Sequence, residues 1–571
     1  MTQLRTPQIL LLGVIASAGL LFALTAGAYE VRLMTLAGIY SIAVLGYQLA
    51  IGHAGVLSLA QGAFFGVGAY VTGILTTQYN VDGAAAMLAG MLVAGVLAAV
   101  VAIPVLRLQT HYFALATLAI AEVVHLTAVN WTAVTGGANG IYGVPPLVFL
   151  GINIGFGWPL FAAVWITAGL AAAMVYWRTG GRRQPRLDLA REAPLAADAI
   201  GINRRQIRFE LFVLSAVLGA TAGGFQAHAI GVVSPAVTDF TLMVTLLVAA
   251  LVGGQRRIIG ALIGGILVIH LPEWFRSFDV FYLIAYGAAL LLVIILAPNG
   301  IAGFWPKRRL RDAAPGLPQS IPQHHRSATL QGQGLVKKFG GITAVDGIDI
   351  NLTAGQITGI IGPNGSGKST LLNLLTGLIK ADRGGIMMND QDLTPYTADG
   401  RARRGLARTF QHPELVPGHS VWETVIAGLP MTIDGPTAAA KTALALDKLS
   451  LRADSAVPTD LLSPESLRRL EIARALANGP RVLLLDEPAA GLSAAEQDRL
   501  ALSLRSLADE GLTIVVVEHG MRFLMPLADV IICLDQGKVI AAASPAAISE
   551  NPHVIDCYLG RDNTIAKAAP T

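Results

Sequence analysis

The first half of the chain is a succession of apolar runs, each close to the length that crosses a lipid bilayer. A transmembrane helix needs about 20 mostly apolar residues. Residues 1–305 contain no lysine, and the whole chain is 53% hydrophobic and only 14% charged. We therefore predict a polytopic α-helical membrane domain of about eight to ten helices over residues 1–305. The candidate spans are residues 8–28, 32–52, 55–76, 84–106, 111–130, 156–177, 209–230, 237–255, 258–275 and 279–299.

Arginines gather in one long loop, and this orients the candidate spans. Cytoplasmic loops of membrane proteins carry an excess of Lys and Arg. We therefore expect the loop to be cytoplasmic, together with Arg256–Arg257 and Lys307–Arg311. Six candidate spans precede the loop and four follow it, so both ends of the membrane domain are expected inside the cell. The arginines of this loop are Arg178, Arg182, Arg183, Arg186, Arg191, Arg204, Arg205 and Arg208.

The net charge is +4, and the basic residues cluster in loops between the apolar spans, as the rule for cytoplasmic loops expects. We therefore expect no nucleic-acid partner. Cys533 and Cys557 are the only cysteines, which fits a reducing compartment and no disulfide framework. The N-terminal apolar run begins after Arg5 and shows no small-residue cleavage site, so we interpret it as an anchor and not as a signal peptide.

The second half of the chain has the composition of an ordinary soluble domain. A polar, proline-rich stretch predicts a linker at residues 306–328. Beyond it, strand-like runs such as Val482–Leu485 and Thr513–Val517 alternate with helical stretches. This alternation predicts an α/β domain with parallel strands at residues 329–562, followed by a short tail at 563–571.

A glycine-rich loop in this domain fits the phosphate-binding pattern G-x-x-x-x-G-K-[ST]. It follows the predicted strand Ile357–Ile361 and precedes a helical run at Leu371–Ile379, which is the context that the pattern requires. Backbone N–H groups and the helix N-terminus would hold a phosphate, Lys368 would reach the β- and γ-phosphates, and Ser369 would bind Mg²⁺. The residues expected to bind ATP here are Gly362, Asn364, Gly365, Ser366, Gly367, Lys368, Ser369 and Thr370.

Two carboxylates end the apolar run Val482–Leu485 further along the chain. An Asp at this position, Asp486, would hold the Mg²⁺ shell, and the following Glu487 would take a proton from the attacking water. The pair is a weak signal alone and a strong one beside the phosphate loop.

With these motifs, residues 330–560 closely resemble the ABC transporter ATPases, a P-loop NTPase family. The resemblance implies that Gln411, in Arg-Thr-Phe-Gln, contacts Mg²⁺ and reports to the membrane domain. It implies that His519, in Val-Glu-His-Gly, contacts the γ-phosphate, and that Phe339 stacks on adenine. Glu487, His519 and Gln411 are then the catalytic residues, and Ser369, Gln411 and Asp486 the Mg²⁺ ligands.

The signature motif departs from the family pattern. Leu-Ser-Gly-Gly-Gln is typical, and this chain has Leu-Ser-Pro-Glu-Ser at residues 462–466, followed by a helix predicted at Leu467–Ala477. In the family, Ser463, Glu465 and Ser466 would face ATP bound by a partner ATPase. The Glu465 carboxylate would repel that anion by roughly 1–4 kcal/mol at about 4 Å, would occupy the helix N-terminus itself, or would swing into solvent at little cost. We hypothesise two unequal ATP sites; Ser493, where Asp is common, adds to this departure.

The membrane half resembles the branched-chain amino acid permeases, and the ATPase resembles the ATP-binding subunits of the same system, including the ending Asn551–Gly560. The resemblance implies an importer of the bacterial inner membrane, with membrane lipid around it, a second permease subunit, a second ATPase subunit and a periplasmic solute-binding protein. The stretch Arg191–Asn203 resembles the coupling helix that docks near the Q-loop glutamine. The permease resemblance lies in Tyr40–Leu75, Leu106–Pro145, Ala190–Asn203 and Ala227–Trp274.

Several points stay open at the level of sequence. Glu122 and His125 lie on one face of a candidate span and either pair internally or line a solute path, as do His53, Gln226, His228 and His270. The loop Trp131–Gly155 is expected in the periplasm, where it could dock the binding protein. Alternatives to import are an ABC exporter, which the single basic loop disfavours, and an ATP-dependent sensor without transport. Branched-chain amino acids are the family default, but relatives carry amides, urea or aromatic acids.

Overall fold

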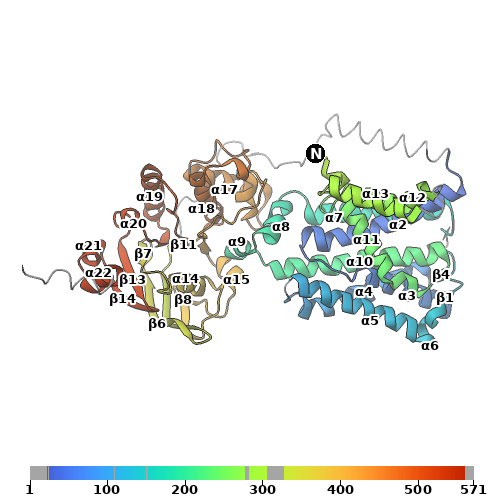
Figure 1. The fold of residues 1–571 in the computed structure, drawn as a ribbon, viewed down its shortest axis with the longest axis horizontal. Helices are drawn as coiled ribbons and strands as arrows, with labels where there is room; N and C mark the ends of the chain where they lie inside the picture. The colour runs from blue at the N-terminus through green and yellow to red at the C-terminus, as the bar shows by residue number, and fades with distance from the viewer. Residues whose placement is uncertain are drawn as a thin grey trace, which may run out of the picture. The chain divides into compact units, whose positions relative to one another are not determined.

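The computed structural model describes residues 25–108, 110–149, 152–276, 282–304 and 327–559, together with Phe22. The chain forms two compact units, coloured along its length in Figure 1. The first unit comprises residues 1–180 and 205–307, and the second comprises residues 181–204 and 308–571. The tail at 563–571 lies outside the described residues, as do most of the expected span at 8–28 and most of the expected linker.

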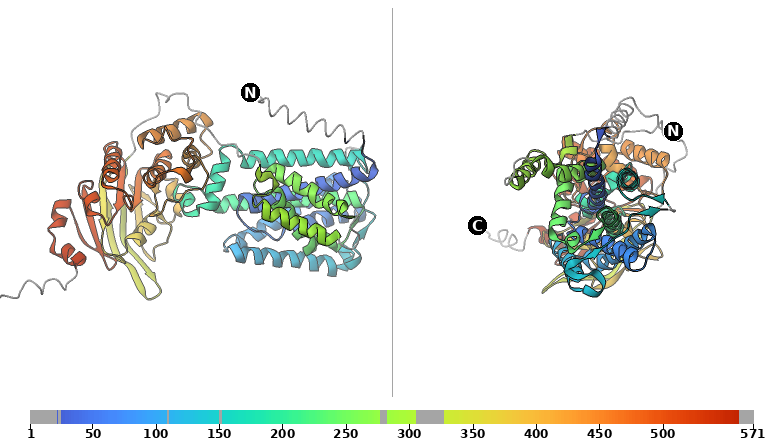
Figure 2. Two further views of the ribbon diagram at one scale, coloured as in Figure 1. Left: turned by 45° about the horizontal axis from the view of Figure 1, so that its top comes forward. Right: turned by 90° about the vertical axis from the view of Figure 1, so that its right-hand side faces the viewer.

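The first unit is built of helices that lie side by side (Figure 2). Five stretches in its described part are long and apolar enough to cross a membrane: Ala28–His53, Gly83–Val105, His111–Asn130, Trp158–Thr179 and Arg204–Ile230. The expectation of a polytopic helical domain is therefore confirmed. The longer helices are α2 (Ala28–Gln48), α3 (Gln61–Gln78), α4 (Gly83–Val105), α5 (Thr110–Asn130), α7 (Trp158–Thr179), α10 (Arg204–Ile230), α11 (Phe240–Gly253), α12 (Ile258–Trp274) and α13 (Tyr282–Leu296).

The expected span at 55–76 is interrupted at its start. A π-helical turn, Leu49–His53, follows α2, and residues 54–60 have no helical structure before α3 begins at Gln61. Most of this segment is buried within the unit, which is where irregular backbone is tolerated at membrane depth. The span expected from residue 209 instead belongs to a longer helix that begins at Arg204.

Glycines allow the helices of the first unit to approach closely. A Cβ added to Gly223 of α10 would lie 1.9 Å from the carbonyl oxygen of Phe65 on α3, and one on Gly68 would lie 2.2 Å from that of Ala220. A Cβ on Gly264 of α12 would lie 2.0 Å from the carbonyl oxygen of Ala249 on α11. Small residues at such crossings bring the backbones of membrane helices into contact.

Buried polar side chains link these helices. The Gln61 amide donates to the carbonyl oxygens of Ala43 (3.1 Å) and Ser215 (3.2 Å) and accepts from the Ser215 hydroxyl (2.9 Å). His125 Nδ1 lies 2.9 Å from Thr238 Oγ1, and His228 Nδ1 lies 2.8 Å from the carbonyl oxygen of Pro145. His125 and His228 are thus held by internal contacts. His270 Nδ1 lies 3.0 Å from the carbonyl oxygen of Ile266 in its own helix, and Gln226 Oε1 is buried with no hydrogen-bond partner in the described part of the chain.

The second unit contains the predicted α/β layers. Its main sheet has the strand order β10-β11-β12-β7-β13-β14, parallel except for the antiparallel pair β13–β14. A second sheet is antiparallel and has the strand order β6-β5-β8-β9. The strands are β5 (Leu330–Phe339), β6 (Ile342–Leu352), β7 (Ile357–Ile361), β8 (Arg383–Met388), β9 (Gln391–Asp392), β10 (Leu406–Arg408), β11 (Val482–Asp486), β12 (Thr513–Val517), β13 (Val530–Asp535) and β14 (Lys538–Ala543).

Strands β7, β11 and β12 are buried at every residue, as expected of a parallel sheet covered on both faces. The helix expected at Leu467–Ala477 begins earlier, at Pro464, because Ser463 is its N-cap and proline is well suited to the first helical position. The longer helices are α14 (Lys368–Thr376), α16 (Val421–Ala427), α17 (Gly435–Lys448), α18 (Pro464–Ala477), α19 (Ala494–Asp509) and α22 (Pro552–Leu559), and a shorter one is α15 (Ala398–Ala402).

Candidate nucleotide site and coupling segment

The glycine-rich loop joins the end of β7 to the start of α14 at Lys368. Gly365 and Gly367 have φ values of +83° and +103°, a region that favours glycine. A Cβ on Gly367 would also lie 2.4 Å from the carbonyl oxygen of Ala344. A side chain at either position would therefore strain the backbone, and at Gly367 it would also collide with β6.

Two side chains in the loop fit a phosphate ligand. The Lys368 ammonium is buried and donates to the carbonyl oxygens of Gly362 (2.8 Å) and Pro363 (2.9 Å). Burial lowers the pKa of Lys368, and the carboxylates of Glu487 and Asp486 oppose that shift. Ser366 Oγ is buried without a hydrogen-bond partner among the described residues. Phosphate oxygens would satisfy that hydroxyl and give the ammonium a charged partner.

The structure brings the three predicted catalytic residues together. Glu487 directly follows β11, with its backbone N–H bonded to the carbonyl oxygen of Val517 (2.9 Å). Its carboxylate accepts a hydrogen bond from Gln411 Nε2 (2.8 Å) and lies 3.4 Å from His519 Nε2. Glu487 has a φ of +46°. This left-handed conformation costs a non-glycine residue about 1–3 kcal/mol and is typical of functional sites.

Asp486 has a partner that the sequence reasoning did not find. Arg408, at the end of β10, donates to the Asp486 carboxylate at 2.8 Å, and both side chains are buried. Burial lowers the pKa of the Arg408 guanidinium, and Asp486 opposes that shift. The available signal was a lone arginine three residues before Gln411, at the end of an apolar strand.

The protein groups near the loop could supply only a few of the ligands of a magnesium ion. Ser369 is exposed at the start of α14, and the Gln411 amide is engaged with Glu487. In the described part of the chain, no group of three or more His, Cys, Asp or Glu side chains could hold a metal ion. Mg²⁺ commonly keeps several waters and binds through one or two protein ligands and substrate phosphates.

The remaining predicted nucleotide residues are accessible. Phe339 ends β5 with 47% of its surface exposed, and the Lys337 ammonium lies 5.6 Å from its ring centroid. A half-exposed ring beside a cation suits a planar ligand. Asn364 and Gly365 are exposed, and Thr370 is half-buried.

Glu465 of the atypical signature is held by two arginines. Arg499 of α19 donates to both carboxylate oxygens, at 2.9 and 3.1 Å, and the Arg469 guanidinium lies 3.6 Å away. The Glu465 side chain is 10% exposed, so it does not swing into solvent. The first turn of α18 is instead capped by Ser463, whose hydroxyl accepts from the backbone N–H of Ser466 (3.2 Å).

Helix α18 also holds the segment that carries Gln411. The backbone N–H of Phe410 donates to Glu471 (3.1 Å), and Arg474 donates to the carbonyl oxygen of Glu414 (2.6 Å). Glu471 and Arg474 lie 3.6 Å apart, and their side chains are only 2% and 1% exposed. Burial raises the pKa of Glu471 to about 7, and the Arg474 guanidinium opposes that rise.

Residues 181–204 belong to the compact unit of the cassette, the ATPase domain of the second half, and we call them the coupling segment. The sequence predicted one coupling helix at Arg191–Asn203. The structure has two, α8 (Arg183–Glu192) and α9 (Pro194–Ala199), separated at Ala193 because the residue before a proline is disfavoured in a helix.

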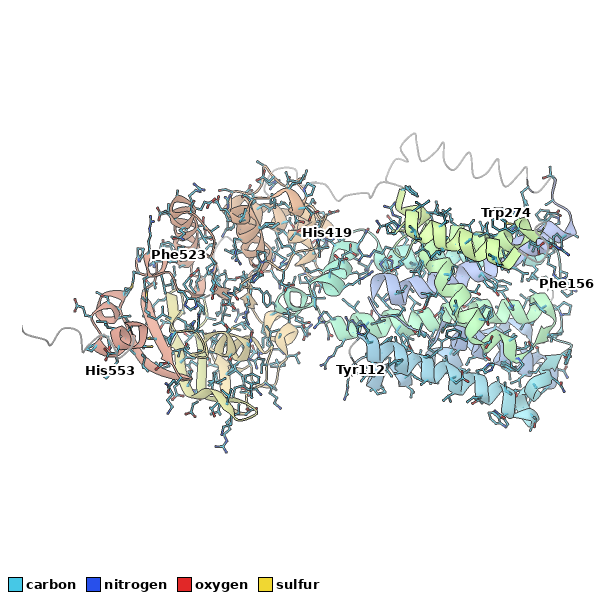
Figure 3. The ribbon with its side chains drawn as sticks, in the orientation of Figure 1. Tyr112, Phe156, Trp274, His419, Phe523 and His553 are labelled. Carbon is cyan, nitrogen blue, oxygen red and sulfur yellow. The ribbon has the colours of Figure 1, made fainter. Side chains whose placement is uncertain are left out.

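Helix α8 and its N-cap Arg182, which lie mostly upstream of the predicted helix, make polar contacts with the cassette, and within the predicted stretch the carbonyl oxygen of Gly201 accepts from Arg403 (3.4 Å). Arg182 and Arg186 donate to the carbonyl oxygens of Ile433 (2.7 Å) and Leu429 (2.8 Å), which follow the C-terminus of α16. His419, labelled in Figure 3, lies 3.1 Å from the buried carboxylate of Asp188. The coupling segment is thus bound through backbone carbonyl groups between α16 and α17 and through one buried polar pair.

A phosphate loop, a carboxylate poised between Gln411 and His519, and a signature helix define an ABC-type ATPase, here in one chain with a polytopic helical unit. Residues 29–297 match the family model described as branched-chain amino acid transport system, permease component, and residues 345–490 match the ABC transporter model. The chain belongs to the ABC transporter family for branched-chain amino acids, as a permease fused to its ATPase.

Curated relatives match the ATPase half. BraF of Pseudomonas aeruginosa, a high-affinity branched-chain amino acid transport ATP-binding protein, is 34% identical over 40% of this chain and 97% of its own length. LivG of Escherichia coli K12, with the same description, is 36% identical over 40% of this chain and 97% of its own length. LptB of Acidithiobacillus ferridurans, a lipopolysaccharide export system ATP-binding protein, is 33% identical over 41% of this chain and 98% of its own length.

Proposed function

We propose that this protein uses ATP hydrolysis to import branched-chain amino acids or related small polar solutes across the bacterial inner membrane. The observation that carries the proposal is the placement of Glu487 between Gln411 and His519, next to the phosphate loop, in a chain that also holds a permease-family unit. The further components would be a second permease subunit, a second ATPase subunit and a periplasmic solute-binding protein.

Hydrolysis follows from the groups around Glu487. Lys368 would exchange its two backbone carbonyl partners for phosphate oxygens, and the Ser366 hydroxyl would gain an acceptor. The Glu487 carboxylate would take the proton of the attacking water, while His519 and Gln411 orient the reacting groups. Mg²⁺, held by Ser369, Gln411 and Asp486 with the phosphates, would neutralise charge on the β- and γ-phosphates.

Coupling to transport is proposed to run through residues 408–433. This stretch begins at Arg408, which holds Asp486, and includes Gln411, which contacts Glu487. It ends at the carbonyl groups that bind Arg182 and Arg186 of the coupling segment. A change at the γ-phosphate that moves Gln411 therefore reaches α8 through one short stretch of chain.

We further propose that the two ATP sites of the assembled transporter are unequal, and the Glu465–Arg499 pair allows a test. Glu465→Gly should raise ATP hydrolysis, because it restores the glycine that is typical of the family signature at this position. Arg499→Gln should lower hydrolysis at that site about fivefold or more, because an unpaired carboxylate would repel the γ-phosphate. Phosphate release from the purified complex measures both effects.

Arg505→Gln is the matched control for the arginine variant. Arg505 lies on the same helix α19 and pairs with Asp529 at 2.8 Å instead of with Glu465. Its loss should leave hydrolysis unchanged. If Glu465→Gly hydrolyses ATP at the wild-type rate, the departure from the signature pattern does not make the sites unequal.

Uptake of a labelled panel tests the main proposal. Cells carrying the wild-type or Glu487→Gln protein with its partner subunits would be supplied with leucine, valine, urea, short amides or benzoate. We expect leucine and valine uptake to disappear in the variant at equal expression. ATP hydrolysis without movement of any solute in either direction would contradict the proposal and favour a sensor.

Export is the second candidate, because the LptB relative shows that an ATPase of this similarity also serves an export system. Inside-out vesicles separate the two directions. With ATP outside, an importer moves labelled leucine out of the lumen, whereas an exporter accumulates solute in the lumen.

A further inference from the structure

Glu122 lies deep within a helix that is expected to cross the membrane. It belongs to α5, eight residues before the helix ends at Asn130. At 1.5 Å per residue this places it about 12 Å from that end. The hydrocarbon core of a bilayer is about 30 Å thick, so Glu122 lies well inside it.

The side chain of Glu122 is exposed and has no partner among the described residues. It forms no hydrogen bond or ion pair there, although its neighbour His125, one turn away, contacts Thr238 at 2.9 Å. Internal pairing, one of the two interpretations that the sequence allowed, therefore accounts for His125 and not for Glu122.

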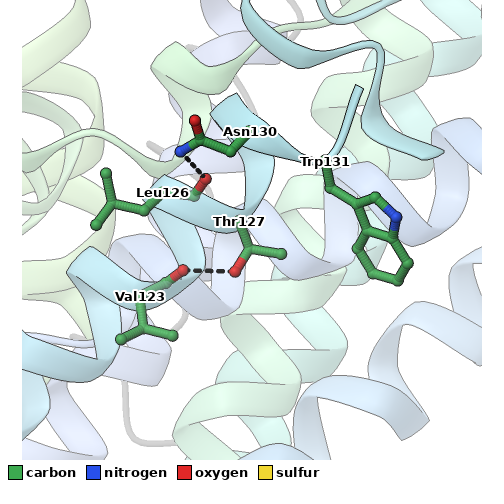
Figure 4. A pocket seen from close by; sticks show the side chains of 5 residues that line it. All are labelled: Val123, Leu126, Thr127, Asn130 and Trp131. Carbon is green, nitrogen blue, oxygen red and sulfur yellow. Dashed lines mark hydrogen bonds between the residues drawn. The ribbon is translucent and has the colours of Figure 1, made fainter. Parts of the chain in front are cut away.

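Glu122 is at the centre of an outward face of α5. Helix α5 lies at one edge of the helical unit (Figure 1), and its exposed residues on this face include Leu115, Ala119 and Leu126. A shallow hollow lies further along α5 and is lined by residues from Val123, the residue after Glu122, to Trp131 (Figure 4). In it, Asn130 donates to the carbonyl oxygen of Leu126 and Thr127 to that of Val123, and Trp131 completes the lining.

A carboxylate at this depth cannot remain facing hydrocarbon without a large cost. Ionisable groups inside membranes face the interior of an assembly or a water-filled cavity, and they pair with other groups or with a transported ion or solute. The described part of this chain offers Glu122 no cation. The outward face of α5 must therefore border water or a cationic group when the transporter is assembled.

We propose that this face of α5 borders the solute path, closed from lipid by the second permease subunit, and that Glu122 binds the ammonium group of an amino-acid solute there. The proposal rests on the proposed import function and narrows its solute class. A carboxylate complements a zwitterion's ammonium group, whereas it gives no charged pair to urea or a neutral amide and repels benzoate.

Water access to position 122 tests whether α5 borders the path, and protection by leucine tests the solute. In a Cys533→Ala/Cys557→Ala background, Glu122→Cys would be exposed to a charged, membrane-impermeant methanethiosulfonate reagent, which reacts only with hydrated thiolate. The control is Ile166→Cys on α7, a residue that is 64% exposed on an apolar helix. We expect modification at 122, slowed by saturating leucine, and none at 166. No modification at 122 in the assembled complex would overturn the proposal.

The carboxylate itself is tested by Glu122→Gln, with Leu115→Gln on the same face as the matched control. Loss of a charge-assisted contact should lower the uptake efficiency for leucine and valine about tenfold or more, and Glu122→Asp should recover part of it. Co-purification of the second permease should not change. Wild-type uptake of leucine by Glu122→Gln, or loss of the second permease from it, would overturn the assignment.

Failure of the import function is distinguishable from failure of this proposal. If the wild-type protein carries urea or benzoate but no amino acid in a Glu487-dependent way, the amino-acid assignment to Glu122 fails together with the proposed solute class. The thiol modification at position 122 then still decides whether α5 borders the path.

Discussion

The Glu487→Gln variant should bind ATP and hydrolyse it at least about a hundred times more slowly than the wild type. The amide keeps the size of the side chain and can still accept from Gln411 Nε2, which lies 2.8 Å from the carboxylate. It cannot take a proton from water, and general-base catalysis contributes about 10²–10⁴ in rate. Phosphate release and binding of a fluorescent ATP analogue, measured on one preparation, would separate turnover from affinity.

Glu496→Gln is the matched control for this variant. Glu496 is a half-buried carboxylate whose side chain completes the capping box of α19, a role that glutamine also fills. If Glu487→Gln turns over within about tenfold of the wild type, the base lies elsewhere. Glu518 is then the next residue to test, because it is buried close by, accepts from the backbone N–H of Ala489 (2.7 Å), and has a pKa raised by burial.

Glu471→Ala should lower the free energy of unfolding of the cassette by about 3–5 kcal/mol. The variant leaves the Arg474 guanidinium without its carboxylate in a site where both side chains are almost fully buried. It also removes the acceptor of the Phe410 backbone N–H. The thermal midpoint of the purified, detergent-solubilised chain would report the change.

The double variant Glu471→Leu/Arg474→Met is the control that isolates the buried charge. Replacing both partners of a buried pair by apolar residues is often neutral, whereas removing one leaves an uncompensated charge. We therefore expect the double variant to melt closer to the wild type than Glu471→Ala does. Equal midpoints for Glu471→Ala and the wild type would show that the pair contributes nothing to stability.

The parts of the fold that follow from local sequence were predictable. Strands Ile357–Ile361 and Thr513–Val517 were predicted with the bounds that the structure has, because short apolar runs next to glycines are specified by nearby residues. The phosphate loop could be located for the same reason. The start of α18 was missed by three residues, because its Ser463 cap and Pro464 belong to an atypical signature.

Contacts between distant residues could not be predicted from one sequence. Arg408 pairs with Asp486 78 positions further on, and Arg499 pairs with Glu465 34 positions before it. The sequence around Arg408 or Arg499 contains no pattern that identifies the carboxylate with which each arginine pairs. The grouping of Gly181–Arg204 with the cassette is of the same kind, because it depends on packing across more than 200 residues of sequence, as in the Arg182–Ile433 contact.

That grouping has a practical consequence for anyone who divides or recombines this chain. A cassette expressed from residue 327 onward lacks α8, and it would present to water the His419 side chain and the carbonyl groups of Leu429 and Ile433. A chimera that takes the cassette of one transporter and the membrane helices of another would separate Asp188 from His419 unless α8 is exchanged as well. The exchangeable module of this protein is therefore discontinuous in sequence.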